Sequence, residues 1–313
     1  MTKRTQKRRL VVASILCSIL LVSTGLFGCT GSSSTVPPET TEPPFSFAFF
    51  SDSQADPEIG DYTAFGGLLE QALASQDAPR LLLLGGDTVN DGSDPKEWTE
   101  FRSATGEVLD GVTVTAVAGN HDKDPLLFEQ FDYPRSQMSE TDEGYFYSFI
   151  DHNIFFLMLD SNAMGAGNTA DVQWVADELA SDAAQTADWR VVVSHHPFWS
   201  VVQAPKDLAR SQTMQEVYLP LLESGGVDLI LCGHQHVYAR VEPTLNGGAK
   251  NSGMIQITVA SGAKDSYHVG DVDGLVYQAQ PPNYLIAKAS ETSLELVAYD
   301  REGVSFDEVR LER

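Results

Sequence analysis

In the stretch Leu81-Leu82-Leu83-Leu84-Gly85-Gly86-Asp87-Thr88-Val89-Asn90, a short apolar run leads directly into a polar motif. The same arrangement occurs before four other motifs: Asp52-Ser53-Gln54, Gly119-Asn120-His121-Asp122, His195-His196-Pro197 and Gly233-His234-Gln235-His236. Short apolar runs bounded by glycine or polar residues are typical of buried strands. In α/β sheets the loops after the carboxyl ends of strands converge on one crevice. The five motifs would gather carboxylate, amide and imidazole groups there, which predicts a metal site.

Asp87 best explains why five motifs should meet. One carboxylate can bridge two cations held roughly 3.5–4 Å apart, the separation found in two-metal hydrolytic sites. Alone, Asp87 would be expected only to cap the turn that follows it, but the companion motifs favour a metal role. His234 and His236 share one face of an extended segment, so each imidazole could serve a different ion. His195 ends its apolar run in the same way, and Asn120 offers a neutral oxygen.

His121 is predicted to act on a substrate rather than on a metal ion. It adjoins Asn120, so its side chain could face the substrate while Asn120 binds metal. An imidazole in that place could stabilise developing charge or protonate a leaving oxygen. The alternative is a purely structural imidazole. His196 is a further candidate for substrate contact.

Together the motifs resemble those of the calcineurin-like metallophosphoesterase superfamily, and further stretches resemble its purple acid phosphatase-like branch. These stretches are Tyr145-Phe146-Tyr147-Ser148-Phe149, Phe155-Phe156-Leu157-Met158-Leu159-Asp160-Ser161-Asn162, Gln173-Trp174 and His196-Pro197-Phe198-Trp199-Ser200. The resemblance runs from about Phe45 to the C-terminus. It implies an α/β fold, a four-layer αββα sandwich in which helices flank two mixed β-sheets.

The resemblance also implies a ligand set and a reaction. One metal ion would be held by Asp52, Gln54, Asp87 and His236, and the other by Asp87, Asn120, His195 and His234. His121 would be the catalytic imidazole. A hydroxide activated at this dinuclear site would attack phosphorus, so the chain would hydrolyse phosphoric esters, with small monoesters as the favoured substrates. The donor types leave Fe, Zn and Mn open as the two ions.

Two other functions stay open at this point. One is a phosphodiesterase acting on cyclic nucleotides or other small diesters, because the same site could hydrolyse either class of ester. The other is a non-catalytic lipoprotein that binds phosphate, although a full ligand set with His121 disfavours it. The crevice walls, which would select the substrate, are predicted to come from the loops Pro125–Thr141, Trp199–Arg210 and Ala263–Pro282.

Two positions depart from the pattern of the family. Gln54 stands where many members have a histidine, and an amide oxygen is a weaker donor than imidazole. Asn90 lies three residues after the bridging Asp87, where the purple enzymes carry a metal-ligating tyrosine. Without that phenolate, we expect no charge-transfer colour and less reason for a tightly held ferric ion.

The N-terminal 28 residues are predicted to be a lipoprotein signal peptide. Five basic residues precede an apolar run, Leu10 to Val22, and Leu26-Phe27-Gly28-Cys29 resembles a bacterial lipobox with Cys29 as the lipid site. An uncleaved N-terminal anchor is the alternative. Residues 29–44 would be a Ser/Thr/Pro-rich tether and residues 45–313 the catalytic domain. The domain would then be exported and lipid-anchored on the outer side of a bacterial membrane, at the cell surface or in the periplasm.

Charge and cysteine usage restrict the partners of this chain. Its formal net charge is −24, and removal of residues 1–28 would delete five basic residues and no acidic ones, giving −29. Nucleic acid is therefore not an expected partner, because its phosphates would be repelled. Of three cysteines, Cys232 alone falls within the predicted domain, which excludes an intradomain disulfide. We expect a small phosphorylated substrate and a membrane contact through Cys29; the oligomeric state is open.

The remaining pattern alternates strands and helices and then becomes rich in strands. Thr169 is predicted to cap a helix that runs to about Ser181. A further helix is predicted over Thr213–Glu223, with a kink at Pro220.

Overall fold

A computed structural model of the chain describes residues 45–55, 61–123, 125–131, 145–165, 168–245, 249–250, 253–262, 264 and 266–313. The predicted signal peptide, the tether with Cys29 and most of the loop Pro125–Thr141 lie outside these residues. Among the helices described, none has the length and apolar character that a membrane span requires.

One sheet contains six strands in the order β15-β14-β13-β1-β2-β3. Their bounds are β1 (Phe45–Phe50), β2 (Leu81–Leu84), β3 (Thr113–Ala116), β13 (Asn283–Ala289), β14 (Ser293–Asp300) and β15 (Ser305–Glu312). β1, β2 and β3 run parallel, whereas β13, β14 and β15 are antiparallel to their neighbours. Every residue of β1 and β2 is buried, as expected for strands covered on both faces.

The second sheet contains seven strands in the order β12-β8-β11-β7-β6-β5-β4. Their bounds are β4 (Tyr147–Asp151), β5 (Ile154–Leu159), β6 (Trp189–Ser194), β7 (Leu229–Cys232), β8 (Tyr238–Val241), β11 (Ile255–Thr258) and β12 (Leu275–Ala279). β5, β6, β7 and β11 are parallel, and β4, β8 and β12 are antiparallel to their neighbours. A short ribbon pairs β9 (Thr244–Leu245) with β10 (Ala249–Lys250).

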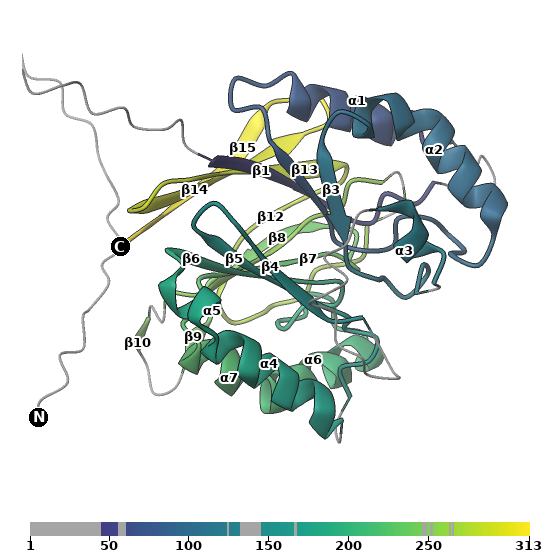
Figure 1. Ribbon diagram of the computed structural model, residues 1–313. Coiled ribbons are helices and arrows are strands. Elements are labelled where there is room, and N and C mark those ends of the chain that lie inside the picture. Colours follow the sequence, from purple (N-terminus) through teal and green to yellow (C-terminus); the bar gives the residue numbers. More distant parts are fainter. Residues whose placement is uncertain are drawn as a thin grey trace, which may run out of the picture.

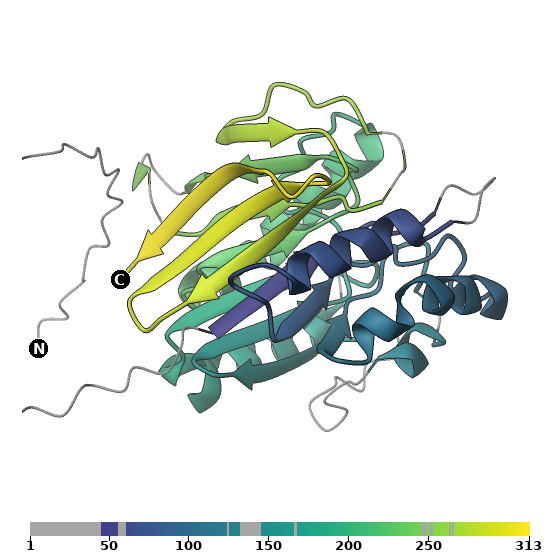
Figure 2. The same ribbon diagram turned by 90° about the horizontal axis from the view of Figure 1, so that it is seen from above.

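Helices cover the outer faces of both sheets (Figure 1). The six-stranded sheet carries α1 (Thr63–Leu73), α2 (Pro95–Leu109) and α3 (Leu127–Gln130). The seven-stranded sheet carries α4 (Thr169–Ala180), α5 (Asp182–Thr186), α6 (Pro205–Val217) and α7 (Leu219–Ser224). Seen from above, the yellow C-terminal strands lie beside the purple β1, and α1 lies over the sheet next to them (Figure 2).

Three apolar cores hold these four layers together. The central core lies between the two sheets, where Phe47 meets Phe156 edge-on with ring centroids 5.3 Å apart. A second core packs the six-stranded sheet against α1 and α2 through residues such as Phe101, and a third packs the seven-stranded sheet against α4 to α7. The helices bury the apolar outer faces of the two sheets, and the inner faces bury each other. The predicted four-layer αββα sandwich is therefore confirmed.

Two helix predictions need correction. Asn168, rather than Thr169, caps α4, and its side chain accepts a hydrogen bond from the Asp171 N–H at 3.4 Å. The single kinked helix predicted over Thr213–Glu223 is two helices. α6 already begins at Pro205, and Pro220 lies in the first turn of α7, where a missing N–H is tolerated.

Two predicted loops also contain regular structure. The first six residues of α6 fall within the predicted loop Trp199–Arg210. The predicted loop Ala263–Pro282 contains β12, an edge strand whose residues are exposed or half-buried. Edge strands need not alternate between apolar and polar residues when neither face is deeply buried, so no period-two pattern marks β12.

Candidate metal centre

The five motifs meet where the parallel strands of the two sheets end. Asp52 follows β1 and Asp87 follows β2 in one sheet, whereas His195 follows β6 and His234 follows β7 in the other. Two hydrogen bonds join them across the sheets. The His195 ring nitrogen Nδ1 donates to the Gly85 carbonyl oxygen (2.9 Å), and the His234 N–H donates to Asp52 Oδ2 (2.8 Å).

The motifs approach so closely that glycine is required between them. A Cβ at Gly119 would lie 2.1 Å from the backbone nitrogen of Asp87, and one at Gly233 would lie 2.2 Å from Asp52 Oδ2. Neither distance is compatible with a side chain. The glycines that open the Gly-Asn-His and Gly-His-x-His motifs therefore allow the polar loops to converge.

Backbone strain is concentrated in these motifs. Asp52 (φ 53°), Asp87 (φ 51°), His234 (φ 70°) and His236 (φ 45°) all have left-handed backbone conformations. Such conformations are uncommon for residues other than glycine and cost on the order of 1–3 kcal/mol each. Among the described non-glycine residues, only His152 also has a positive φ. The surrounding structure holds these four residues in place, which is typical of functional sites.

One set of buried donors, the carboxylate cluster, consists of Asp52, Asp87 and His236. One ligand atom of each lies within 4.8 Å of those of the others. His236 Nε2 is 3.5 Å from Asp52 Oδ1. Gln54 is fully buried beside the cluster, and its Nε2 donates to Asp87 Oδ2 at 3.2 Å. On its outer side, the half-exposed Tyr267 stacks on the His236 ring with centroids 5.0 Å apart.

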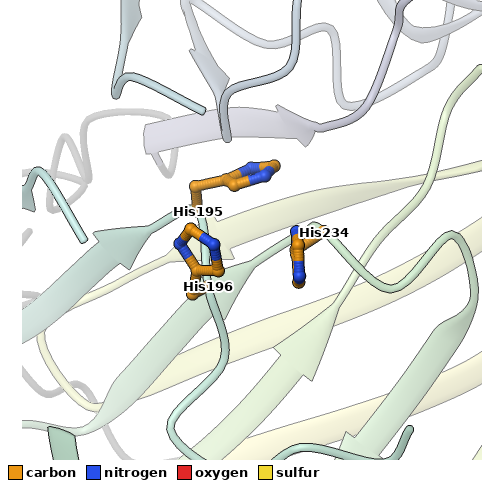
Figure 3. A group of neighbouring side chains, drawn as sticks. All are labelled: His195, His196 and His234. Carbon is orange, nitrogen blue, oxygen red and sulfur yellow. The ribbon is translucent and has the colours of Figure 1, made fainter. Parts of the chain in front are cut away.

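A second set, the imidazole cluster, consists of His195, His196 and His234 (Figure 3), whose ligand atoms also lie within 4.8 Å of one another. Each ring has one nitrogen in a hydrogen bond. The partners are the Gly85 carbonyl for His195 Nδ1, Ser161 Oγ for His196 Nδ1 (2.8 Å) and Asp207 Oδ1 for His234 Nε2 (3.2 Å). Each ring therefore keeps its other nitrogen for a ligand. His195 Nε2 lies 3.4 Å from Asp87 Oδ2, so the two clusters adjoin.

The donors fit metal ions. Asp52 Oδ1, Gln54 Oε1 and His195 Nε2 are buried, and none has a hydrogen-bond partner among the described residues. A buried polar atom without a partner costs about 1–3 kcal/mol. Coordination to a cation would satisfy all three, and a mixed set of carboxylate, amide and imidazole donors suits Zn, Mn or Fe. We therefore assign this crevice as a candidate metal centre.

The electrostatics of these side chains agree with this assignment. Burial raises the pKa of Asp52 to about 7. Burial would raise the pKa of Asp87 as well, but the charge of the adjacent His195 and a hydrogen bond from the His121 N–H hold the pKa of Asp87 well below its ordinary value. Burial opposes protonation of His195, yet Asp87 raises the pKa of this imidazole to about 10. Near neutral pH these values leave His195 protonated and Asp52 partly protonated, so metal binding here would release protons.

His121 is exposed beside the carboxylate cluster, and two contacts orient it. Its backbone N–H donates to Asp87 Oδ1 (2.9 Å), and its ring Nδ1 lies 2.8 Å from the carbonyl oxygen of Asn90. Since a carbonyl only accepts, Nδ1 carries the proton and Nε2 is left for a substrate. Asn120 lies beside it, also exposed, and its side chain makes no hydrogen bond to the described part of the chain.

Several supporting residues were not predicted. Asp122, which is fully buried, accepts hydrogen bonds from the Gly119 and Thr88 N–H groups (2.6 and 2.5 Å) and thereby fixes the loop that carries His121. Asn162 donates to the Gly119 carbonyl (3.0 Å) from the loop after β5. That loop could have been found, because Asp160-Ser161-Asn162 also follows an apolar run. No apolar run precedes Asp207 on α6, so no such pattern marks it in the sequence.

Asn90, which stands at the tyrosine position of the purple enzymes, is held by residues outside the two clusters, and its Oδ1 is buried without a hydrogen-bond partner among the described residues. Its side-chain Nδ2 donates to the Ala55 carbonyl (2.8 Å), and its backbone N–H donates to Glu97 Oε2 (2.7 Å). Glu97 also accepts from the Tyr62 hydroxyl (3.0 Å). The described contact between Asn90 and the site is therefore through its backbone carbonyl, which orients His121.

Sequence comparison shows which family of proteins has this fold and these motifs. The sequence model of the calcineurin-like phosphoesterase family matches residues 45–238, more than half of the chain. The chain belongs to this family. Its relatives place it in the purple acid phosphatase-like branch.

Two of these relatives are plant enzymes. Purple acid phosphatase 22 of Arabidopsis thaliana is 26% identical over 229 residues, which cover 70% of this chain and 50% of the relative. Probable purple acid phosphatase 20 of the same plant is 26% identical over 155 residues, covering 50% of this chain and 35% of the relative. The chain thus spans half or less of the length of these relatives.

Solved structures share the fold. A purple acid phosphatase from yellow lupin (Lupinus luteus) seeds superposes with a TM-score of 0.72 at 17% identity, covering 87% of this chain and 54% of that chain. GAP50, described as the anchor in the inner membrane complex of Plasmodium, superposes with a TM-score of 0.61 at 17% identity, covering 87% of this chain and 89% of that chain. At these identities the likeness concerns the fold alone.

Proposed function

We propose that this protein hydrolyses phosphate monoesters of small soluble molecules at a centre that holds two divalent metal ions. The observation that carries the proposal is the pair of adjoining donor clusters, which meet where Asp87 Oδ2 lies 3.4 Å from His195 Nε2. Membership of the phosphoesterase family and the purple acid phosphatase relatives support hydrolysis of a phosphoric ester. The acidic chain disfavours a polyanionic substrate.

The residues would divide between two ions, and Asp87 would contribute to both. Asp52, Asp87 and His236 would hold one ion, with Gln54 Oε1 within the same pocket as a fourth donor. Asp87, His195, His234 and Asn120 would hold the other. When bound, such ions offset phosphoryl charge and lower the pKa of a coordinated water to about 7.

His121 is proposed as the general acid–base group, which transfers a proton to or from a reacting oxygen. The Asn90 carbonyl holds its ring through Nδ1, which leaves Nε2 available to a substrate. From there a protonated imidazole can donate to the leaving oxygen, and a neutral one can accept a proton, in either case within reach of a bound ester. His196, which is buried and bonded through Nδ1 to Ser161, is less suited to substrate contact than the exposed His121.

The test is a comparison of ester classes on metal-reconstituted protein. Metal-free protein would be loaded with Mn, Zn or Fe and assayed with p-nitrophenyl phosphate, bis-p-nitrophenyl phosphate and cyclic AMP. We expect turnover of the monoester with at least one metal, two ions bound per chain, and no turnover by metal-free protein. Preference for the diesters would favour a phosphodiesterase, and phosphate binding without turnover of any ester would favour a binding lipoprotein. Iron-loaded protein is expected to lack a phenolate charge-transfer band, because Asn90 supplies no phenol.

We further propose that the domain is exported and held at a bacterial membrane through Cys29. The basic segment, the apolar run and the lipobox-like Leu26-Phe27-Gly28-Cys29 support this, followed by a Ser/Thr/Pro-rich tether. Cys29→Ser should move the protein from the membrane to the soluble exported fraction, or leave an uncleaved precursor. Membrane association of a mature-sized Cys29→Ser protein would contradict the lipid anchor.

A further inference from the structure

α6 brings a carboxylate to the imidazole cluster from outside the five motifs. Asp207 lies in the first turn of this helix, and its Oδ1 is 3.2 Å from His234 Nε2. A neutral imidazole that donates from Nε2 presents the lone pair of Nδ1. Asp207 therefore fixes which nitrogen of His234 is available to a metal ion. Carboxylates in this relation also raise the basicity of the metal-binding ring.

Asp207 differs from the supports of the other two rings because it is charged. His195 donates to a backbone carbonyl and His196 is paired with the hydroxyl of Ser161, and both of these are neutral partners. Hydrogen bonds to an ionised acceptor are roughly twice as strong as neutral ones. His234 is therefore the ring of the cluster whose donor strength depends most on a single side chain.

The position of Asp207 is fixed through the loop that leads into α6. Gln235, which lies between His234 and His236 and is fully buried, accepts from the Val201 N–H (2.9 Å) and donates to Ser200 Oγ (2.5 Å). The same motif that carries His234 thus anchors the loop before Asp207.

A second set of contacts anchors the helix itself. Ser211 Oγ donates to the Pro197 carbonyl (2.9 Å), and Arg210 Nη1 donates to the Ser161 carbonyl (2.7 Å). Pro205 begins the helix at a position where proline is favoured. Asp207 is only 18% exposed beside a His234 side chain that is 19% exposed. These contacts distinguish it from a free surface carboxylate.

We propose that Asp207 is a positioning residue for His234, and that it sets the affinity of the metal ion at the imidazole cluster without affecting the ion at the carboxylate cluster. The inference rests on the proposed function, since it requires two metal sites. It adds a residue of α6 to a site otherwise built from strand-end loops.

The experiment measures metal content rather than turnover. Protein loaded with two Mn ions would be titrated with a chelator, and bound Mn would be counted at each step for wild type, Asp207→Ala, Asp207→Asn and Glu216→Gln. Glu216 is an exposed acid on the same helix, paired only with Gln212 among the described residues, and it controls for loss of one negative charge from α6. Melting of the metal-free proteins controls for general damage, because an acid in the first turn also favours the helix.

We expect Asp207→Ala to lose one of its two ions at a chelator concentration about 10–100-fold lower than wild type, the usual effect of removing a partner of a metal-binding histidine. The other ion should be retained as in wild type. Asp207→Asn should lose this ion at a chelator concentration between those of wild type and Asp207→Ala, because its amide oxygen still accepts from His234 Nε2 but carries no charge. Glu216→Gln should match wild type.

Two results would overturn the inference. One is retention of both ions by Asp207→Ala at the wild-type chelator concentration. The other is equal weakening of both ions together with a lowered melting temperature of the metal-free protein, which would show damage to the fold. A wild-type protein that binds fewer than two ions would instead contradict the metal centre of the proposed function, so the two failures are distinguishable.

Discussion

The carboxylate cluster and the imidazole cluster adjoin, yet they are supported in different ways. Asp52, Asp87 and His236 are buried, and their described partners lie largely within the motifs themselves, such as the Gln54 amide and the N–H groups of His121 and His234. The imidazole cluster is held by groups on other elements, including Ser161 after β5 and Asp207 on α6. The carboxylate cluster is therefore the self-contained half of the site. The imidazole cluster is the wall-dependent half, where the wall means α6 with the loop before it and the loop after β5.

This difference separates two roles within one centre. The self-contained half is fixed by the ends of parallel strands, which are the most buried parts of the fold. The wall-dependent half can be altered through α6 and its loop without disturbing those strands. Changes in the wall should therefore tune one metal ion selectively, and changes in the shared Asp87 should affect both.

Asp87→Asn should have the largest effect, because Asp87 adjoins both clusters. Asparagine tolerates the left-handed backbone (φ 51°) and can still accept from the His121 N–H, so the change removes mainly the charge. We expect activity to become undetectable and both ions to be lost at lower chelator concentrations. Metal counting with assay of a monoester would test this. Two bound ions with undiminished turnover would show that Asp87 is not shared.

His121→Ala should reduce turnover by about two to four orders of magnitude while both ions stay bound, the usual contribution of an acid–base group. The ring touches the Asn90 carbonyl rather than either cluster, so its loss should spare metal affinity. The measurement is kcat together with metal content. Loss of an ion on this substitution would make His121 part of the metal centre instead. His152→Ala, an exposed histidine in the turn between β4 and β5, is the matched control.

The self-contained half could be predicted from sequence because its ligands and supports share the same short motifs. An apolar run followed by Asp-x-Gln or Gly-Asp marks both the buried strand and the donor that follows it. The close approach of Gly119 and Gly233 to the two aspartates follows from the same motifs. The sandwich itself was predictable for the same reason, since its central strands are apolar runs.

The wall-dependent half was only partly predictable, because α6 has little apolar periodicity. In this helix Met214 is buried, but Leu208 is 39% exposed, so no apolar stripe marks its first turns. The sequence therefore predicts a loop over Trp199–Arg210, and no pattern marks Asp207 as a partner of His234. Asp207 is positioned through the buried Gln235, which accepts a hydrogen bond from the Val201 N–H. These two residues are 34 positions apart, and neither composition nor spacing predicts that they meet.

Gln235→Leu should have an intermediate effect that falls mainly on the imidazole cluster. Leucine leaves the buried Val201 N–H without its acceptor, which should lower the free energy of unfolding by about 1–3 kcal/mol. It should also loosen the loop before α6 and so lower the affinity of the same ion that Asp207→Ala affects, by about tenfold or less. Chemical denaturation and chelator titration measure the two effects. The exposed Gln212→Ala on α6 is the control.

A double variant sharpens this test. If Gln235 acts through Asp207, the combination Gln235→Leu with Asp207→Ala should weaken the ion no more than Asp207→Ala alone, because residues in one network are not additive. Additive losses would show that Gln235 acts on His234 directly through the backbone of its own motif.

Gln54→His should have the smallest effect, and it concerns the self-contained half. Gln54 Oε1 is buried without a hydrogen-bond partner in the described chain, as a metal ligand in a metal-free site would be, but its Nε2 also holds Asp87 Oδ2 at 3.2 Å. If the amide oxygen is a ligand, imidazole is the stronger donor, and the ion at the carboxylate cluster should bind up to about tenfold more tightly. If Gln54 only orients Asp87, histidine brings no gain, and Gln54→Leu should weaken both ions through their shared carboxylate. Chelator titration of wild type and both variants, with bound Mn counted, separates these outcomes. A selective gain for one ion in Gln54→His, together with a selective loss of that ion in Gln54→Leu, is what ligation by Gln54 requires.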